Sequence, residues 1–108
     1  MRTQIHRALL AAFTALLLVA CQSDEQKISQ HLSRAQEYYD AEKWSEAVIE
    51  YKNVLQIDPN HAPAHHALAR AYLRNRQPRE GFWELRETVR LDAANLDAKL
   101  EFAQLALL

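Results

Sequence analysis

Three histidines, His61, His65 and His66, form the densest group of potential metal ligands in the chain. His61 and His65 are four residues apart, a spacing that can place two ligands on one face of a helix. However, His61 precedes Pro63 and is expected in a turn, and no Glu or Cys nearby in the sequence completes a ligand set. We therefore expect these histidines to be polar residues at a junction between helices.

Arg70 and Arg74 are separated by one helical turn, so their guanidinium groups can share one surface. Such a pair suits a carboxylate or an extended acidic peptide, because a guanidinium can bind two carboxylate oxygens with parallel hydrogen bonds. The alternative is that the two arginines pair with Asp40 or face water. Both interpretations require a helix that presents the pair on one side.

Other features argue against an enzyme. The chain of 108 residues has one glycine, which leaves no glycine-rich loop to hold a phosphate. No Ser, His and Asp can be assigned to a catalytic triad. The net charge of −1 lacks the positive excess that is typical of nucleic-acid binding. We expect no catalytic residue, no cofactor, no metal, no nucleic acid and no small-molecule substrate.

Residues 1–20 have the layout of a secretory signal peptide. Arg2 and Arg7 form a positive start, and the apolar run 8–20 is too short to cross a hydrocarbon core of about 30 Å as a helix. The run ends in Leu-Val-Ala before Cys21, the only cysteine, and this ending resembles the lipobox of bacterial lipoprotein precursors. The resemblance implies cleavage before Cys21 and acylation of that cysteine, for example with palmitate. A plain secretory signal or an uncut anchor is the alternative.

Residues 21–27 are then expected to form the lipidated cysteine and a short polar tether. Several acyl chains anchor a protein stably, because each buried CH₂ contributes about 0.8 kcal/mol. By resemblance to enterobacterial lipoproteins, Gln22 favours the outer membrane over the inner membrane. The expected location is the bacterial cell envelope, with the protein anchored by its lipid and facing the periplasm.

The rest of the chain has the apolar spacing of helices, with apolar side chains recurring every three or four residues. The helices that this predicts span about 28–41, 45–57, 63–75, 79–91 and 96–108. Ser45 is expected to cap the start of the second helix. Asp58 and Pro59 end it, because the residue before a proline is forced out of the helical region.

These helices repeat with a period of 34 residues. The matching positions are Ala35, Ala69 and Ala103; Tyr38 and Tyr72; and Ala47 and Gly81, with Pro59 at the end of the first unit. Together they resemble the tetratricopeptide repeat (TPR), a hairpin of two helices. The resemblance implies an all-α solenoid with repeats at 28–61 and 62–95 and the first helix of a truncated repeat at 96–108.

The small residues of the repeat predict close helix packing. We expect Ala35, Ala69 and Ala103 to lie where the helices of each hairpin approach most closely, with Ala47 and Gly81 on the return helix. Larger side chains there would force the helices apart.

The end of the chain, 102–108, is apolar and lacks the polar face that terminal repeats present. We therefore expect a fragment of a longer TPR protein, or a last helix that docks on another chain. The lipobox and the repeat together resemble the TPR lipoproteins of Gram-negative envelopes. Within that group, segment 47–59 is similar to proteins that accompany exosortase and PEP-CTERM export systems.

The resemblance also implies a concave groove lined by the first helix of each repeat. Its residues here are Leu32, Gln36, Tyr39, Asp40, His66, Arg70, Leu73, Arg74, Leu100, Gln104 and Leu107. The candidate partner-binding residues are Tyr39, His66, Arg70, Leu73 and Arg74. Leu32 and Gln36 replace the Lys and Asn of the family's carboxylate clamp, so that clamp is not expected.

The expected function is that of a membrane-anchored periplasmic adaptor. It binds a protein partner of an envelope export or assembly complex through the groove. The alternative is a structural segment of a longer TPR solenoid with no ligand in this groove. Trp44 and Trp83 are expected to be packing residues rather than contact points for the partner.

Overall fold

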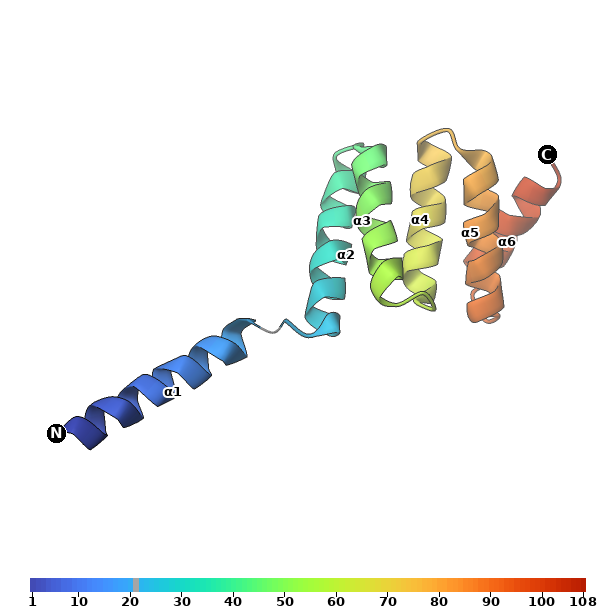
Figure 1. The fold of residues 1–108 in the computed structure, drawn as a ribbon. Coiled ribbons are helices and arrows are strands. Elements are labelled where there is room, and N and C mark those ends of the chain that lie inside the picture. The colour runs from blue at the N-terminus through green and yellow to red at the C-terminus, as the bar shows by residue number, and fades with distance from the viewer. Residues whose placement is uncertain (21) are drawn as a thin grey trace.

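The computed structural model describes residues 1–20 and 22–108, and in this part of the chain it contains six helices and no strand (Figure 1). The helices are α1 (Arg2–Ala20), α2 (Asp24–Asp40), α3 (Trp44–Ile57), α4 (Ala62–Arg74), α5 (Pro78–Leu91) and α6 (Leu96–Ala106). α2 and α3 form one hairpin, α4 and α5 form a second hairpin, and α6 follows against α5. The all-α arrangement of stacked helical hairpins confirms the predicted fold.

The helix α1 lies apart from α2–α6 in Figure 1. No helix of the described residues is both long enough and apolar enough to span a membrane. The predicted lipidation site, Cys21, lies outside the described residues.

α2 begins at Asp24 rather than at residue 28, so most of the segment predicted to be a polar tether is helical. Ser23 caps the helix, because its hydroxyl accepts a hydrogen bond from the Gln26 amide and the Gln26 side chain accepts one from the Ser23 amide, both at 3.3 Å. Asp24 and Glu25 add negative charge in the first turn, where the helix dipole favours it. The residue types of this capping box stand in the sequence, but a prediction from apolar spacing does not detect them because the segment lacks apolar residues.

The prediction that Ser45 caps the helix over residues 45–57 is wrong. α3 begins at Trp44, and its N-cap is Lys43, whose side chain makes no capping hydrogen bond. The Ser45 hydroxyl lies 3.4 Å from Asn75 Oδ1 instead. The predicted end of this helix is confirmed, because α3 stops at Ile57 with Asp58 as its C-cap.

The starts of α4 and α6 repeat one capping arrangement. His61 Nδ1 accepts a hydrogen bond from the Ala64 amide, and Asn95 Oδ1 accepts one from the Ala98 amide, each at 3.0 Å. His61 and Asn95 occupy equivalent positions of the two repeats. A capping bond of this kind stabilises a helix start by about 1 kcal/mol.

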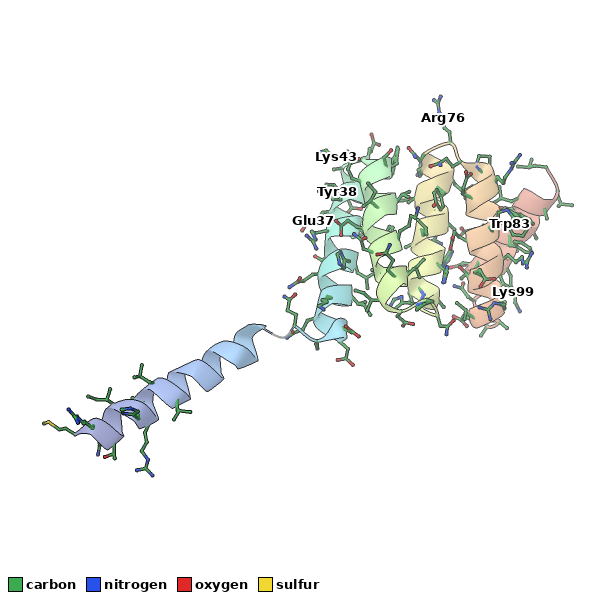
Figure 2. The ribbon with its side chains drawn as sticks, in the orientation of Figure 1. Glu37, Tyr38, Lys43, Arg76, Trp83 and Lys99 are labelled. Carbon is green, nitrogen blue, oxygen red and sulfur yellow. The ribbon has the colours of Figure 1, made fainter. Side chains whose placement is uncertain are left out.

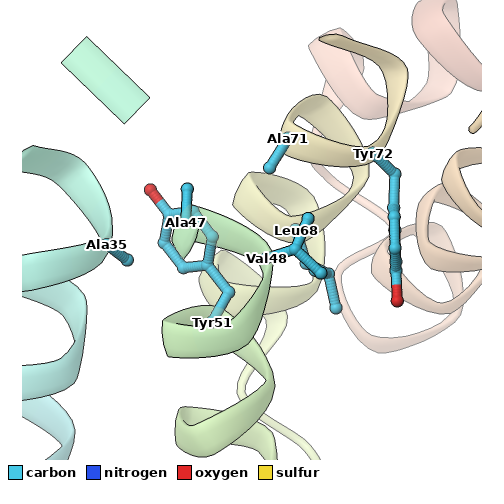
Figure 3. Close-up of a cluster of buried hydrophobic side chains, with 7 residues drawn as sticks. All are labelled: Ala35, Ala47, Val48, Tyr51, Leu68, Ala71 and Tyr72. Carbon is cyan, nitrogen blue, oxygen red and sulfur yellow. The ribbon is translucent and has the colours of Figure 1, made fainter. Parts of the chain in front are cut away.

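Two buried clusters hold the helices together. The first joins α2, α3 and α4 and consists of Ala35, Ala47, Val48, Tyr51, Leu68, Ala71 and Tyr72 (Figure 3). The second joins α4, α5 and α6 through Ala69, Leu85 and Ala98. Thr88 is also fully buried, and its hydroxyl donates to the Glu84 carbonyl at 2.8 Å.

The predicted close approach is confirmed in both hairpins. Ala35, Ala47 and Ala69 have no exposed surface. A Cβ atom added at Gly81 would lie 2.8 Å from Leu73 Cδ2 and 3.3 Å from the Ala69 carbonyl oxygen. Only a glycine therefore fits at this point without movement of Leu73.

Ala103 departs from that pattern. Its equivalents, Ala35 and Ala69, are buried, whereas Ala103 is exposed on α6. No helix within the described residues covers this face of α6, so the expectation of a close contact at Ala103 is wrong.

The turns after α2 and α4 contain matching left-handed residues. Glu42 has a φ of 59° and Arg76 has a φ of 60°, and neither is a glycine. The left-handed conformation costs a residue with a Cβ atom about 1–2 kcal/mol. The Arg76 side chain extends into solvent away from the helices (Figure 2).

Replacing Arg76 with glycine should raise the free energy of unfolding by about 0.5–1 kcal/mol. Glycine removes the left-handed penalty, while its greater freedom in the unfolded chain offsets part of the gain. Urea unfolding followed by circular dichroism measures the change. Arg76→Ala is the control, because alanine keeps the Cβ atom and should give no gain. Equal stabilisation by the two variants would contradict this explanation.

Candidate functional site

A cavity of about 320 Å³ opens between the two hairpins. It is lined by Gln36, Tyr39, Tyr51, Ala62, Pro63, His66, Ala67, Arg70, Asp92 and Asn95. The structure thus brings together Tyr39, His66 and Arg70 of the predicted partner-binding residues, on the first helices of both repeats. Leu73 and Arg74 do not line the cavity. Leu73 packs against the second cluster near Gly81.

Among the cavity residues that the sequence analysis did not identify as functional, Tyr51 is the most deeply placed. Its side chain comes from α3, behind the two first helices, and is only 3% exposed. None of the described residues forms a hydrogen bond with its hydroxyl, and no fully buried side-chain oxygen or nitrogen in the described residues lacks a partner. The hydroxyl oxygen therefore opens into the cavity. Burial raises the pKa of Tyr51, and the nearby Tyr39 and Asp40 add to the effect, so the hydroxyl stays protonated.

Arg70 is held by Glu101 of α6. Its Nη2 lies 2.7 Å from Glu101 Oε1, and its Nε lies 3.2 Å from the same oxygen. His66 Nε2 also reaches Glu101 Oε1 at 3.2 Å, and Asn95 Nδ2 lies 3.2 Å from His66 Nδ1. These contacts form one polar network between α4 and α6.

The network favours the charged forms of Arg70 and Glu101. The hydrogen bond that Arg70 donates to Glu101 raises the pKa of Arg70. Burial opposes ionisation of Glu101, but hydrogen bonds from Arg70 and His66 outweigh it and lower the pKa of that carboxyl. The proposed pairing of the arginines with Asp40 is wrong for Arg70, because Asp40 instead accepts a hydrogen bond from Gln36 at 2.8 Å.

Arg74 is the last residue of α4. Its guanidinium carbon is 5.6 Å from the centre of the Trp44 ring, a cation–π distance. Trp44 in turn meets Tyr39 edge to face, with ring centres 5.0 Å apart. Trp44 is thus a packing residue, as predicted. Trp83 is 50% exposed, so the packing role predicted for it holds only on the side that contacts Phe82 and Arg86.

The three clustered histidines have separate roles. His61 caps α4, His66 joins the Arg70 network, and His65 links α4 to α5. His65 Nδ1 lies 2.6 Å from Glu84 Oε2, and its Nε2 lies 2.7 Å from the Pro59 carbonyl oxygen. In the part of the chain that the structure describes, no three His, Cys, Asp or Glu side chains are grouped to hold a metal ion.

The first repeat contains the same kind of pair. His31 Nδ1 lies 2.7 Å from Glu50 Oε2, so a histidine and a glutamate bridge the two helices of each hairpin at equivalent positions. The signal for these pairs was present in the sequence, because both members repeat with the 34-residue period. Histidine occupies the position where the TPR pattern has tryptophan.

Comparison with known proteins supports the TPR fold. A family model described as "TPR repeat" matches residues 35–75, which cover α3, α4 and the end of α2. The protein is an all-α solenoid of TPR-like helical hairpins. A search of curated proteins finds no match.

One solved structure with a similar fold is the "First TPR of Spaghetti (RPAP3) bound to HSP90 peptide SRMEEVD". The TM-score is 0.70 at 15% sequence identity, and the match covers 74% of this chain. The present chain spans 64% of the length of that structure.

Proposed function

We propose that the protein is an adaptor that binds an extended segment of a protein partner through the groove between its hairpins. The observation that carries this proposal is the cavity, which collects polar side chains from both repeats around the open hydroxyl of Tyr51. A concave site with a few convergent polar groups is typical of a binding site. The TPR structure with a bound peptide shows a similar fold in a peptide-binding protein.

We further propose that the adaptor is anchored to the envelope through Cys21 and faces the periplasm, with the outer membrane favoured over the inner. The support is the sequence of the leader, with Arg2 and Arg7 before an uncharged apolar run and a single cysteine after it. Its partner would belong to an export or assembly complex of the exosortase-associated type. Replacing Cys21 with serine should abolish labelling with radioactive palmitate and release the protein from the membrane fraction. Retention of both would refute the lipid anchor.

Photo-crosslinking in cells tests the adaptor role. A photoreactive amino acid at Gln36, which is exposed and lines the cavity, should capture one dominant envelope protein from the full-length chain. Gln36 is preferable to Arg74, whose side chain is stacked on Trp44. The control is Lys52, an exposed residue of α3 at a different surface hollow, bordered by Leu55 and Glu84. Capture from Lys52 but not from Gln36 would place the partner outside the groove.

The alternative function is a structural segment of a longer solenoid. It is favoured by the exposed apolar side chains of α6, among them Leu100, which is 63% exposed, and by the exposed Leu107 that follows this helix. Side chains of this kind normally pack against a following helix in a repeat array. Under this alternative, crosslinking from Gln36 would capture nothing or only further copies of the protein.

A further inference from the structure

We propose that the groove cavity receives the lysine or arginine side chain of a basic peptide segment, rather than an acidic one. This inference rests on the proposed adaptor function and names the chemistry of the partner. The cavity of about 320 Å³ is at the small end of the range for ligand pockets. It therefore suits one long side chain of an extended peptide lying along the groove.

The Tyr51 hydroxyl has no hydrogen-bond partner among the described residues. The equivalent position in the second repeat is Leu85, which is fully buried and apolar, so packing at this position does not need a hydroxyl. Tyr51 nevertheless carries a hydroxyl that reaches the cavity and forms no hydrogen bond with the described residues. Because no fully buried side-chain oxygen among the described residues lacks a partner, the Tyr51 hydroxyl oxygen is open to the cavity, and a group that enters the cavity can form a hydrogen bond with it.

Carboxylates lie in and near the cavity. Asp92 lines it from the turn between α5 and α6, and Asp40 is close enough to raise the pKa of Tyr51. Asp97 and Glu101 act on Arg70 from α6. Glu101 already balances the charge of Arg70, and Arg74 does not line the cavity, so the carboxylates of Asp92 and Asp40 favour an incoming cation there.

Arg70 is already paired with Glu101. Its Nη2 and Nε both already face Glu101, at 2.7 and 3.2 Å from one carboxylate oxygen. An acidic ligand would have to displace Glu101 and leave that carboxylate, which also bonds His66, without its partners. Such an exchange gains little, because one charge-assisted bond replaces another. A cationic side chain leaves this network intact.

The test uses the full-length chain in detergent and three pools of short peptides that differ only in a central residue, fixed as Lys, Gln or Glu. The Lys pool should be retained at least about fivefold more than the Glu pool at low salt. The difference should shrink as salt screens the charges. Tyr51→Phe should weaken retention of the Lys pool about tenfold to a hundredfold, as expected for a lost hydrogen bond to a charged group. Asp92→Asn should weaken it about twofold, because Asp92 is exposed.

Tyr72→Phe is the matched control. It removes the hydroxyl of another buried tyrosine, which lies close to Glu84 and outside the groove cavity, and should leave peptide retention unchanged. The inference would be overturned if the protein preferred the Glu pool, retained all pools equally or retained none. It would also be overturned if Tyr51→Phe and Tyr72→Phe had equal effects. Crosslinking from Gln36 distinguishes failure of the basic-peptide inference from failure of the adaptor function. A captured partner without a lysine preference refutes only the inference, whereas no captured partner refutes both.

Discussion

Replacing Ala69 with leucine should lower the free energy of unfolding by about 2–3 kcal/mol. Ala69 has no exposed surface, and its carbonyl oxygen is already close to the backbone of α5 at Gly81. A leucine side chain has no space there, so α4 and α5 must separate or their side chains must adopt strained rotamers. Urea unfolding followed by circular dichroism measures the loss.

Ala103 provides a control within the same chain. It occupies the equivalent repeat position but is exposed, so Ala103→Leu should change the free energy of unfolding by no more than about 0.5 kcal/mol. Equal stability of the two leucine variants would contradict this explanation. It would show that close packing is not the reason why small residues recur at this repeat position.

Replacing His65 with leucine should cost about 2–3 kcal/mol. Both ring nitrogens face oxygen acceptors, Glu84 Oε2 and the Pro59 carbonyl, so the change leaves two acceptors without a donor. Leaving a buried acceptor unpaired costs about 1–3 kcal/mol, and the partial exposure of Glu84 keeps the total moderate. The same urea titration applies, with the helix content of the folded protein checked first.

His31→Leu is the matched comparison and should cost only about 1 kcal/mol. The His31 ring makes the equivalent bond to Glu50, but Arg34 lies 3.7 Å from the same oxygen and can still neutralise it. No backbone carbonyl loses a donor in this variant. Equal losses at both positions would show that the Pro59 carbonyl does not contribute.

Much of the fold could be predicted from the sequence because it depends on local spacing. The period that aligns Tyr38 with Tyr72 also placed the buried alanines of both hairpins, and the proline at residue 59 located the end of α3. The errors at helix starts have a local cause as well. Ser23 and Gln26 cap α2 through side-chain bonds that an apolar period cannot detect.

The candidate site could be predicted only in part. Three of the predicted residues, Tyr39, His66 and Arg70, line the cavity together, because a helical period fixes which residues share a face. The pairing of Arg70 with Glu101 depends on how α6 is rotated against α4, and sequence spacing does not encode that rotation. The sequence carries no signal for Tyr51 at this site, because a buried aromatic ring on α3 has the spacing of a core residue whether or not its hydroxyl reaches a cavity.

The main contacts of the described helices run only between neighbours in the chain, from α2 to α3, α3 to α4, α4 to α5 and α5 to α6. Few of the packed residues are distant in sequence, so the chain closes only short loops as it folds, and folding should be fast. Amide hydrogen exchange should then form a gradient instead of a single rate. The amides of α3 and α4, packed on both sides, should exchange slowest, and those of α6 should open first.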